Sequence, residues 1–259
     1  MTAALATSVA ALPPMAAAAG RLTDIWVYLA ATPLLGLTVT LLVYQAAFVL
    51  YRRSGFHPLA HPVATALLVL GTLLWATGTP YASYFEGAQF VHFLLGPATV
   101  ALAVPLFEQL ARLRRLWLPM LGALVVGTLA ATVTAIGTGW ALGASRATLA
   151  SLAPKSVTTP VAMGIAEQIG GIPSLTAVLV VATGIVGAAG GRALFDALGI
   201  RDPAVRGFAL GTAAHGIGTA RAFQVSEEMG AFAGLAMGLS ALFSAAALPW
   251  VAGGLLRWL

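Results

Sequence analysis

Long uncharged runs of apolar residues, separated by short clusters of charge, dominate the hydrophobic and polar pattern of this chain. Stretches without Asp, Glu, Lys or Arg occur at residues 25–51, 54–85, 87–107, 116–145, 168–191 and 229–256. A helix that spans a bilayer needs about 20 apolar residues, and most of these runs are long enough. The runs are continuously apolar instead of alternating at every second residue, which predicts helices rather than a β-barrel.

We therefore predict an all-α, polytopic membrane helix bundle. The expected helical segments are residues 26–50, 60–79, 89–110, 117–141, 148–169, 174–192, 205–224 and 230–256. The Ala-rich residues 1–23 lack the basic start and the compact apolar stretch of a secretory signal, so we interpret them as a loosely structured, apolar N-terminal extension. Residues 24–259 then form a single membrane domain.

The composition agrees with this pattern. The chain has 59% hydrophobic and 8% charged residues and a mean hydropathy of +0.93, whereas soluble domains carry about 25% charged residues. This deficit of charge argues against a soluble enzyme. The absence of cysteine excludes disulfides, thiol catalysis and thiolate metal sites.

The placement of charge predicts how the chain crosses the membrane. Arginines gather at residues 52–53, 112–115, 192–206 and 257, which the positive-inside rule places in the cytoplasm. The connections around Glu86 and at residues 226–230 are acidic and are expected outside, which gives an outer amino terminus and an inner carboxyl terminus. Three apolar segments nevertheless lie between the cytoplasmic clusters at residues 112–115 and 192–206, and three full crossings cannot return the chain to the same side. Residues 148–169 fit a crossing least well, so we predict seven crossings plus a re-entrant segment there, or eight crossings.

The segment at residues 154–160, Pro-Lys-Ser-Val-Thr-Thr-Pro, carries the most chemical information. Pro160 suits the first position of a new helix with Thr159 as its cap. The amino end of such a helix favours an anion, and Lys155 adds a formal charge beside it. In the alternative interpretation, Lys155 extends to the membrane interface and the threonines only bond to backbone carbonyls.

A second interrupted segment covers residues 207–221. Gly216 and Gly218 bracket the expected break, so that one helix ends at His215 with Gly216 in a left-handed cap and another begins at Thr219. Paired broken helices of this kind form the midplane sites of many secondary transporters. In the alternative, the glycines permit close helix packing and His215 is a neutral, hydrogen-bonded core residue.

A third interruption at residues 95–105 contains Pro97 and resembles residues 154–160 in having two prolines with a threonine between them, which suggests an internal repeat. His57 and His61 lie four residues apart, but no nearby carboxylate completes a metal site. The arginines are scattered among the ends of the apolar segments, so no nucleic-acid surface is expected.

Several motifs resemble the LrgB/CidB family. They are Leu-Ala-Pro-Lys-Ser-Val-Thr-Thr-Pro-Val-Ala at residues 152–162, Leu-Gly-Pro-Ala-Thr-Val-Ala-Leu-Ala at 95–103, Ile-Gly-Gly-Ile-Pro at 169–173, Thr-Gly-Ile at 183–185, and Gly-Thr-Ala-Ala-His-Gly at 211–216 followed by Gly218 and Thr219. The resemblance extends from about residue 25 to the end. The chain departs from the family pattern at Gln224, where an acidic residue is usual, and at His61, where asparagine is usual.

The resemblance implies two functions. Some members are described as antiholin-like regulators of murein hydrolase export and cell lysis that act with a smaller LrgA/CidA-type membrane partner. Others resemble carriers of small carboxylates, namely glycolate and glycerate in plastids and pyruvate in bacteria. A lysine, hydroxyls and helix amino ends fit a carboxylate ligand, so we expect the chain to be a carrier and not an enzyme.

These inferences define the expected site. The substrate, a small organic anion, is expected to bind Lys155, Ser156, Thr158, Thr159, His215, Thr219 and Arg221. The expected helix breaks are Pro97, Pro154, Pro160, Gly216 and Gly218. We assign no metal and no cofactor, and we expect a multi-pass protein of the bacterial inner membrane that associates with an LrgA/CidA-type partner or with itself.

Overall fold

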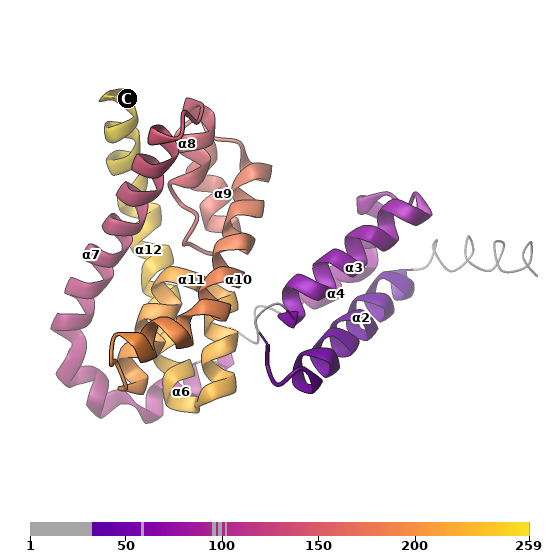
Figure 1. Ribbon diagram of the computed structural model, residues 1–259, viewed down its shortest axis with the longest axis horizontal. Coiled ribbons are helices and arrows are strands. Elements are labelled where there is room, and N and C mark those ends of the chain that lie inside the picture. The colour runs from indigo at the N-terminus through magenta and orange to yellow at the C-terminus, as the bar shows by residue number, and fades with distance from the viewer. Residues whose placement is uncertain (1–32, 58–59, 95–96, 98–99, 102, 259) are drawn as a thin grey trace, which may run out of the picture. The chain divides into compact units, whose positions relative to one another are not determined.

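The computed structural model describes residues 33–57, 60–94, 97, 100–101 and 103–258, which form helices and short connections with no strand among them (Figure 1). The all-α prediction is confirmed. The extension at residues 1–23 lies outside the described residues. The helices are α2 (Pro33–Arg53), α3 (Pro62–Thr77), α4 (Tyr81–Phe93), α6 (Ala103–Glu108), α7 (Leu110–Ala141), α8 (Arg146–Leu152), α9 (Thr159–Gln168), α10 (Pro173–Ala197), α11 (Pro203–Val225) and α12 (Glu227–Trp258).

Two compact units divide the described chain. The first contains residues 33–46 and 66–94 and therefore most of α2 and α3 together with α4. Gly36 of α2 lies directly against α4, because a Cβ atom there would come within 2.4 Å of the carbonyl oxygen of Tyr84. The hydroxyls of Thr40 and Tyr84 share a hydrogen bond of 2.7 Å, which fixes the register of these two helices.

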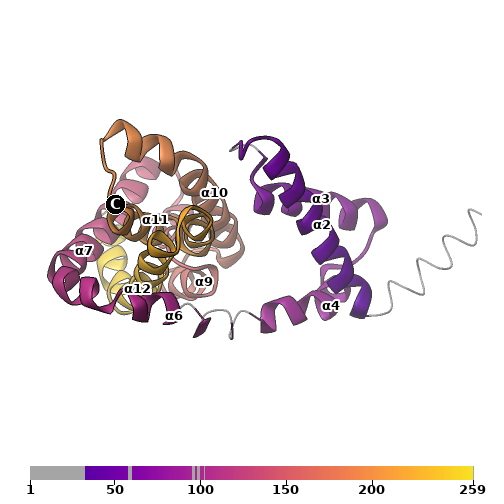
Figure 2. The same cartoon turned by 90° about the horizontal axis from the view of Figure 1, so that it is seen from below.

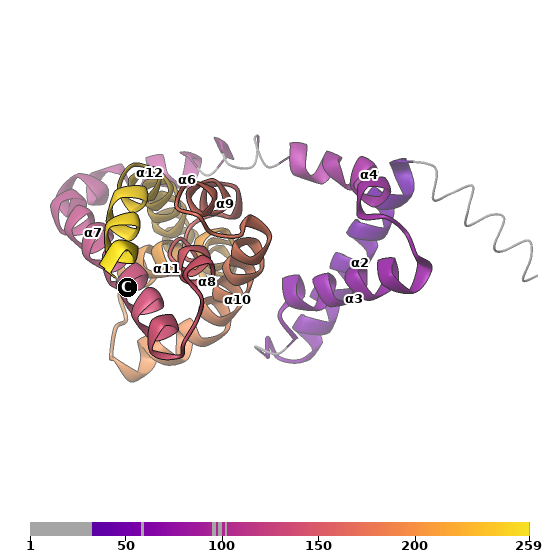
Figure 3. The same cartoon turned by 90° about the horizontal axis from the view of Figure 1, so that it is seen from above.

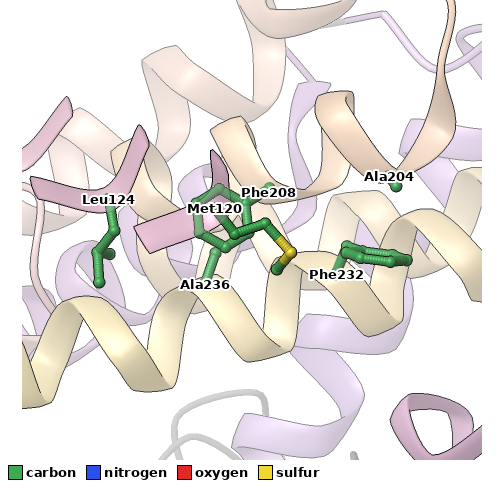
Figure 4. Packing of buried hydrophobic residues seen from close by; sticks show 6 residues of the cluster. All are labelled: Met120, Leu124, Ala204, Phe208, Phe232 and Ala236. Atoms are coloured by element: carbon green, nitrogen blue, oxygen red, sulfur yellow. The ribbon is translucent and has the colours of Figure 1, made fainter. Parts of the chain in front are cut away.

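The second unit contains residues 47–65 and the described residues from 97 onward. Its core forms where α7, α11 and α12 meet. Met120 and Leu124 of α7 pack with Phe208 of α11 and with Phe232 and Ala236 of α12 (Figure 4). Burying large apolar side chains from three helices at one place holds these helices together.

Four helices are long and apolar enough to cross a membrane within the described part of the chain. They cover Leu34–Arg53, Leu110–Ala141, Pro173–Ala197 and Glu227–Trp258. Large apolar side chains on these helices are strongly exposed, for example Val126 at 68%, Val186 at 71% and Leu242 at 72%. Lipid is the solvent that tolerates such a surface. The chain is therefore an integral membrane protein.

Two of the expected helical segments are each divided between separate helices. Residues 89–110 do not form one helix, because α4 ends at Phe93 and α6 covers only Ala103–Glu108. Pro97 lies between them and lacks a backbone N–H donor, but residues 95–96 and 98–99 lie outside the described chain, so a break at Pro97 itself stays a prediction. Residues 148–169 form α8 and α9, which confirms the discontinuous helix expected there.

Candidate functional site

Helices α8 and α9 form a hairpin that enters the second unit from the end where α7 terminates. Ser145 caps α8, and its Oγ accepts a hydrogen bond of 3.3 Å from the backbone N–H of Thr148. Further in, Thr176 of α10 donates to the carbonyl oxygen of Ser151 at 3.2 Å, and Thr132 of α7 donates to that of Ala153 at 3.3 Å. The hairpin is thus anchored to both long helices beside it.

The turn of this hairpin, residues 153–158, holds the segment that the sequence singled out. Pro154, Ser156 and Val157 are buried there. The expected cap was wrong by one residue, because Thr158 is the N-cap of α9, without a side-chain capping bond, and Thr159 already belongs to the helix. Pro160 fits the second helical position because the first four N–H groups of a helix have no intrahelical partner.

Helix α11 reverses direction within its own length. The guanidinium of Arg112 at the start of α7 pairs with Asp202, just before α11, and with Glu228, just after it. A straight helix of 23 residues would be about 35 Å long, so its two ends could not reach one side chain. Helix α11 is therefore a second hairpin.

The contacts with α12 trace the two limbs of α11. A Cβ at Gly207 would meet the carbonyl oxygen of Met229, and one at Gly211 would meet that of Ala233, so the first limb runs parallel to α12. Along the second limb, Thr219 contacts Met237 whereas Phe223 lies against Gly230, so this limb runs back. Figure 2 shows α11 between α10 and α12.

The reversal occurs at His215, whose φ of 42° and ψ of −133° are not helical. The expected left-handed cap at Gly216 is therefore wrong, because neither Gly216 nor Gly218 has a positive φ and both lie in the second limb. Gly218 serves close packing instead. A Cβ there would lie 2.7 Å from both the Leu210 carbonyl oxygen and the Ala214 Cβ. The two limbs touch at this point, which only glycine permits.

The tips of the two hairpins meet at Val180, in the first half of α10. The buried His215 donates a hydrogen bond of 2.9 Å from Nε2 to the carbonyl oxygen of Val180. Val157 of the α8–α9 turn and Val180 belong to one buried cluster. Because the α8–α9 hairpin enters beside the end of α7 and α11 enters beside its start, the two tips approach this residue from opposite ends.

A structural repeat underlies this meeting. A long helix followed by a hairpin occurs first as α7 with residues 146–168 and again as α10 with residues 203–225. Helices α7 and α10 run in opposite directions, since α7 begins and α10 finishes near Arg112. The repeat is therefore inverted.

The comparisons with known proteins agree with the motifs. The model of the LrgB-like family matches residues 40–253. The chain belongs to the LrgB-like family. The resemblance seen in the sequence is thereby confirmed.

Relatives in the LrgB-like family match most of the chain. The antiholin-like protein LrgB of Bacillus mycoides (strain KBAB4) is 32% identical over 219 residues, which are 84% of this chain and 95% of the relative. The proteins of the same name from Bacillus cereus (strain B4264) and Bacillus anthracis (strain CDC 684 / NRRL 3495) are 31% identical with the same coverage. No solved structure matches the chain.

The reversal of α11 corrects the expected orientation of this LrgB-like chain. Residues 226–230 were expected on the side opposite to residues 112–115, yet Glu228 pairs with Arg112. The final helix then runs to the other end, where Leu256 packs in one cluster with Leu149 of α8. Figure 3 looks onto that end and shows α8 near the carboxyl terminus. Arg257 therefore lies at the opposite end from Arg112. The charge pattern alone gave the wrong orientation because both ends of α11 lie beside Arg112.

The structure separates the predicted substrate residues into three places. Lys155 lies 3.4 Å from the Ser156 hydroxyl and lines a cavity of about 360 Å³ together with Thr134 and Thr138 of α7. His215 faces α10, and Thr219 donates to its carbonyl oxygen at 2.8 Å. Lys155 and His215 thus belong to adjoining tips but face different long helices.

Arg221 lies apart from both tips. It follows His215 by six residues on the limb that returns toward the Arg112 end, donates to the side-chain oxygen of Gln224 at 3.2 Å, and has its guanidinium carbon 6.0 Å from the centre of the Phe56 ring. The substrate roles of all these residues stay predictions.

Two residues at the meeting point were not among the predicted site residues. Val180 is an apolar residue that acts through its backbone carbonyl, which no side-chain signal reveals. Gly184 provides the space for the imidazole, because a Cβ there would lie 2.7 Å from the His215 ring. Its place in the Thr-Gly-Ile motif at residues 183–185 is the one sequence signal that marks it.

Proposed function

We propose that this chain is a secondary carrier for a small organic anion, such as the monocarboxylates pyruvate, glycolate and glycerate. The observation that carries the proposal is the meeting of two opposed hairpins at Val180. Broken helices place helix ends and unpaired backbone groups within the membrane, where only a polar ligand or a protein partner can satisfy them.

The chemistry of the two tips favours a negative ligand. Helix α9 begins at the α8–α9 turn, and the second limb of α11 begins just after His215, so two positively polarised helix starts lie near the meeting point. Lys155 adds a formal positive charge, which costs about 2.5–3.5 kcal/mol to place at the centre of a bilayer on insertion scales. A bound carboxylate would offset that cost.

Uptake by purified protein in liposomes tests the proposal. Lys155→Ala removes the ammonium, and His215→Gly removes the imidazole while leaving a residue that adopts a positive φ without strain. Both variants are expected to lose most uptake of labelled pyruvate, glycolate and glycerate. Arg146→Ala is the matched control, since Arg146 is an exposed cation at the mouth of the same hairpin. Wild-type uptake by both tip variants would refute the carrier site.

An antiholin-like regulator is the second candidate, and the names of the relatives support it better than they support transport. In this function the chain acts with an LrgA/CidA-type membrane partner on murein hydrolase export and cell lysis and has no substrate of its own. Deleting the chain would change murein hydrolase activity, whereas the purified protein would show no uptake of any of the three acids. Uptake that depends on Lys155 and His215 would count against this candidate. Both proposals include a location in the bacterial inner membrane and association between copies of the chain.

A further inference from the structure

A charged cavity of about 350 Å³ lies between α10 and the two limbs of α11, near the end of the second unit marked by Arg112. Its charged lining consists of Arg192 and Asp196 from α10, Arg206 from the first limb and Arg221 from the second. Three guanidinium groups face one carboxylate. The cavity therefore carries excess positive charge within an otherwise apolar protein.

The single carboxylate of the cavity, that of Asp196, already has a hydrogen-bond partner. Asp196 accepts a hydrogen bond of 2.5 Å from Arg206, whose Nε also donates to the carbonyl oxygen of Ile200 at 2.6 Å. The Nε of Arg192 lies 3.7 Å from Asp196, and 80% of the Arg192 side chain is exposed, which places it at the mouth. Arg206 and Asp196 thus form a fixed wall, while Arg192 can still take a ligand.

Arg221 has no carboxylate partner among the described residues. Its hydrogen bond goes to the neutral amide oxygen of Gln224, and its guanidinium lies by the ring of Phe56. A guanidinium held by neutral partners keeps its charge and its forked donors available for a carboxylate.

Leu210 of the first limb and Ala188 of α10 also line the cavity. Leu210 precedes His215 by five residues, which is about 7.5 Å of helix. An anion in the cavity would therefore lie one to two helical turns from the point where α11 reverses.

We infer that this cavity is the anion-binding vestibule at the Arg112 end, where one carboxylate group of a small organic acid binds between Arg192 and Arg221. Recognition uses paired guanidinium groups, which bind planar carboxylates through two parallel hydrogen bonds. This inference deepens the proposed carrier function and rests on it for the identity of the ligand, but binding can be measured without transport.

Equilibrium binding of labelled pyruvate to the purified full-length chain, held in nanodiscs of neutral lipid at low chloride, tests the vestibule. Arg192→Gln and Arg221→Gln are each expected to weaken binding at least about tenfold, which corresponds to losing one charged hydrogen-bonding group. Arg201→Gln is the matched control. Arg201 is exposed on the α10–α11 connection and does not line the cavity, so this variant makes the same change of charge outside it. Binding by Arg201→Gln should stay within about twofold of wild type.

A second variant keeps Arg221 in place, so that weaker binding cannot be explained by misfolding of the Arg221→Gln protein. Gln224→Glu keeps the side-chain size and the stacking of Arg221 near Phe56 but offers Arg221 a competing carboxylate, so it should also weaken binding about tenfold.

The inference is overturned if wild type binds no pyruvate, if Arg221→Gln and Gln224→Glu both bind like wild type, or if Arg201→Gln weakens binding equally. Uptake measured in parallel separates the two proposals. Binding that requires Arg192 and Arg221 without any uptake would refute the carrier and keep the vestibule, whereas uptake with unchanged binding in the variants would refute only the vestibule.

Discussion

The two hairpins reach the same residue of α10 by different local means. The α8–α9 hairpin turns over residues 153–158, with a proline and a buried hydroxyl in the turn, whereas α11 reverses at His215 alone. A turn spread over several residues needs turn-forming residue types and so leaves a mark in the sequence. A reversal at one residue needs only that the surroundings hold that residue in place.

Packing inside the hairpins differs in the same way. In α11 the limbs touch each other, because Gly218 lies against the backbone of Leu210. In the other hairpin, Gly164 of α9 faces open space, and that hairpin is held by side-chain bonds to its neighbours, such as the bond from Thr132 to Ala153. Contacts between its own limbs therefore add to the contacts of α11 with α12, whereas the α8–α9 hairpin is held by its bonds to α7 and α10.

Adding one methyl group to each hairpin should have opposite effects on stability. Gly218→Ala would place a Cβ 2.7 Å from the Leu210 carbonyl oxygen and should destabilise the protein by about 1–3 kcal/mol through overpacking. Gly164→Ala has nothing within 4 Å and should stabilise α9 by up to about 1 kcal/mol, because alanine favours helix over glycine. Unfolding in mixed detergent measures both. Equal effects of the two substitutions would contradict the difference in packing.

A smaller effect is expected at the residues that begin the hairpins. Asp202 caps α11 by accepting from the N–H groups of Ala204 and Val205, at 2.9 and 3.2 Å, and also pairs with Arg112. Asp202→Ala should cost about 2 kcal/mol, of which about 1 kcal/mol is the cap and the rest a half-exposed ion pair. Ser145→Ala removes a cap and the hydrogen bond that Ser145 shares with the Thr148 hydroxyl, but no ion pair, and should cost about 1 kcal/mol.

Asp202→Asn separates the two contributions. Asparagine still caps a helix but carries no charge, so this variant should lie between wild type and Asp202→Ala. A loss as large as that of Asp202→Ala would mean that the ion pair with Arg112, and not the cap, holds the start of α11.

The sequence predicted those structural elements that local composition determines. The long apolar runs gave α7, α10 and α12, and the prolines and hydroxyls of residues 154–160 indicated the first hairpin. The one-residue error at the cap arose because proline is accepted at more than one position in the first helical turn.

The rest depended on contacts between residues far apart in the chain. Glycines at 216 and 218 pointed to an interruption near the right place, but they could not reveal a full reversal. The reversal requires Gly184 on another helix to make room for the His215 ring, and it brings Glu228 to Arg112. The two residues of this pair are 116 positions apart in the sequence, so no local sequence pattern predicts their contact. The orientation predicted from charge failed for the same reason.

A small effect of pH on stability is expected from the buried imidazole of His61. His61 is buried against the ring of Tyr51, and its Nδ1 has no hydrogen-bond partner in the described chain. Burial lowers the pKa of His61 below its ordinary value of 6.5, and the positive charge of Arg221 lowers this pKa further. As the pH falls below 6.5 toward the lower folded-state pKa, the unfolded chain takes up the proton first, so the free energy of unfolding decreases in that window.

Replacing His61 should reduce this pH dependence. Asparagine at position 61 has no group that titrates in the window, so the unfolding midpoint of His61→Asn should change less than that of wild type between about pH 7 and pH 5. Arg221→Gln removes the second cause but keeps the burial, and it should retain part of the wild-type slope. A wild-type slope in His61→Asn would show that groups other than the imidazole of His61 carry the pH dependence.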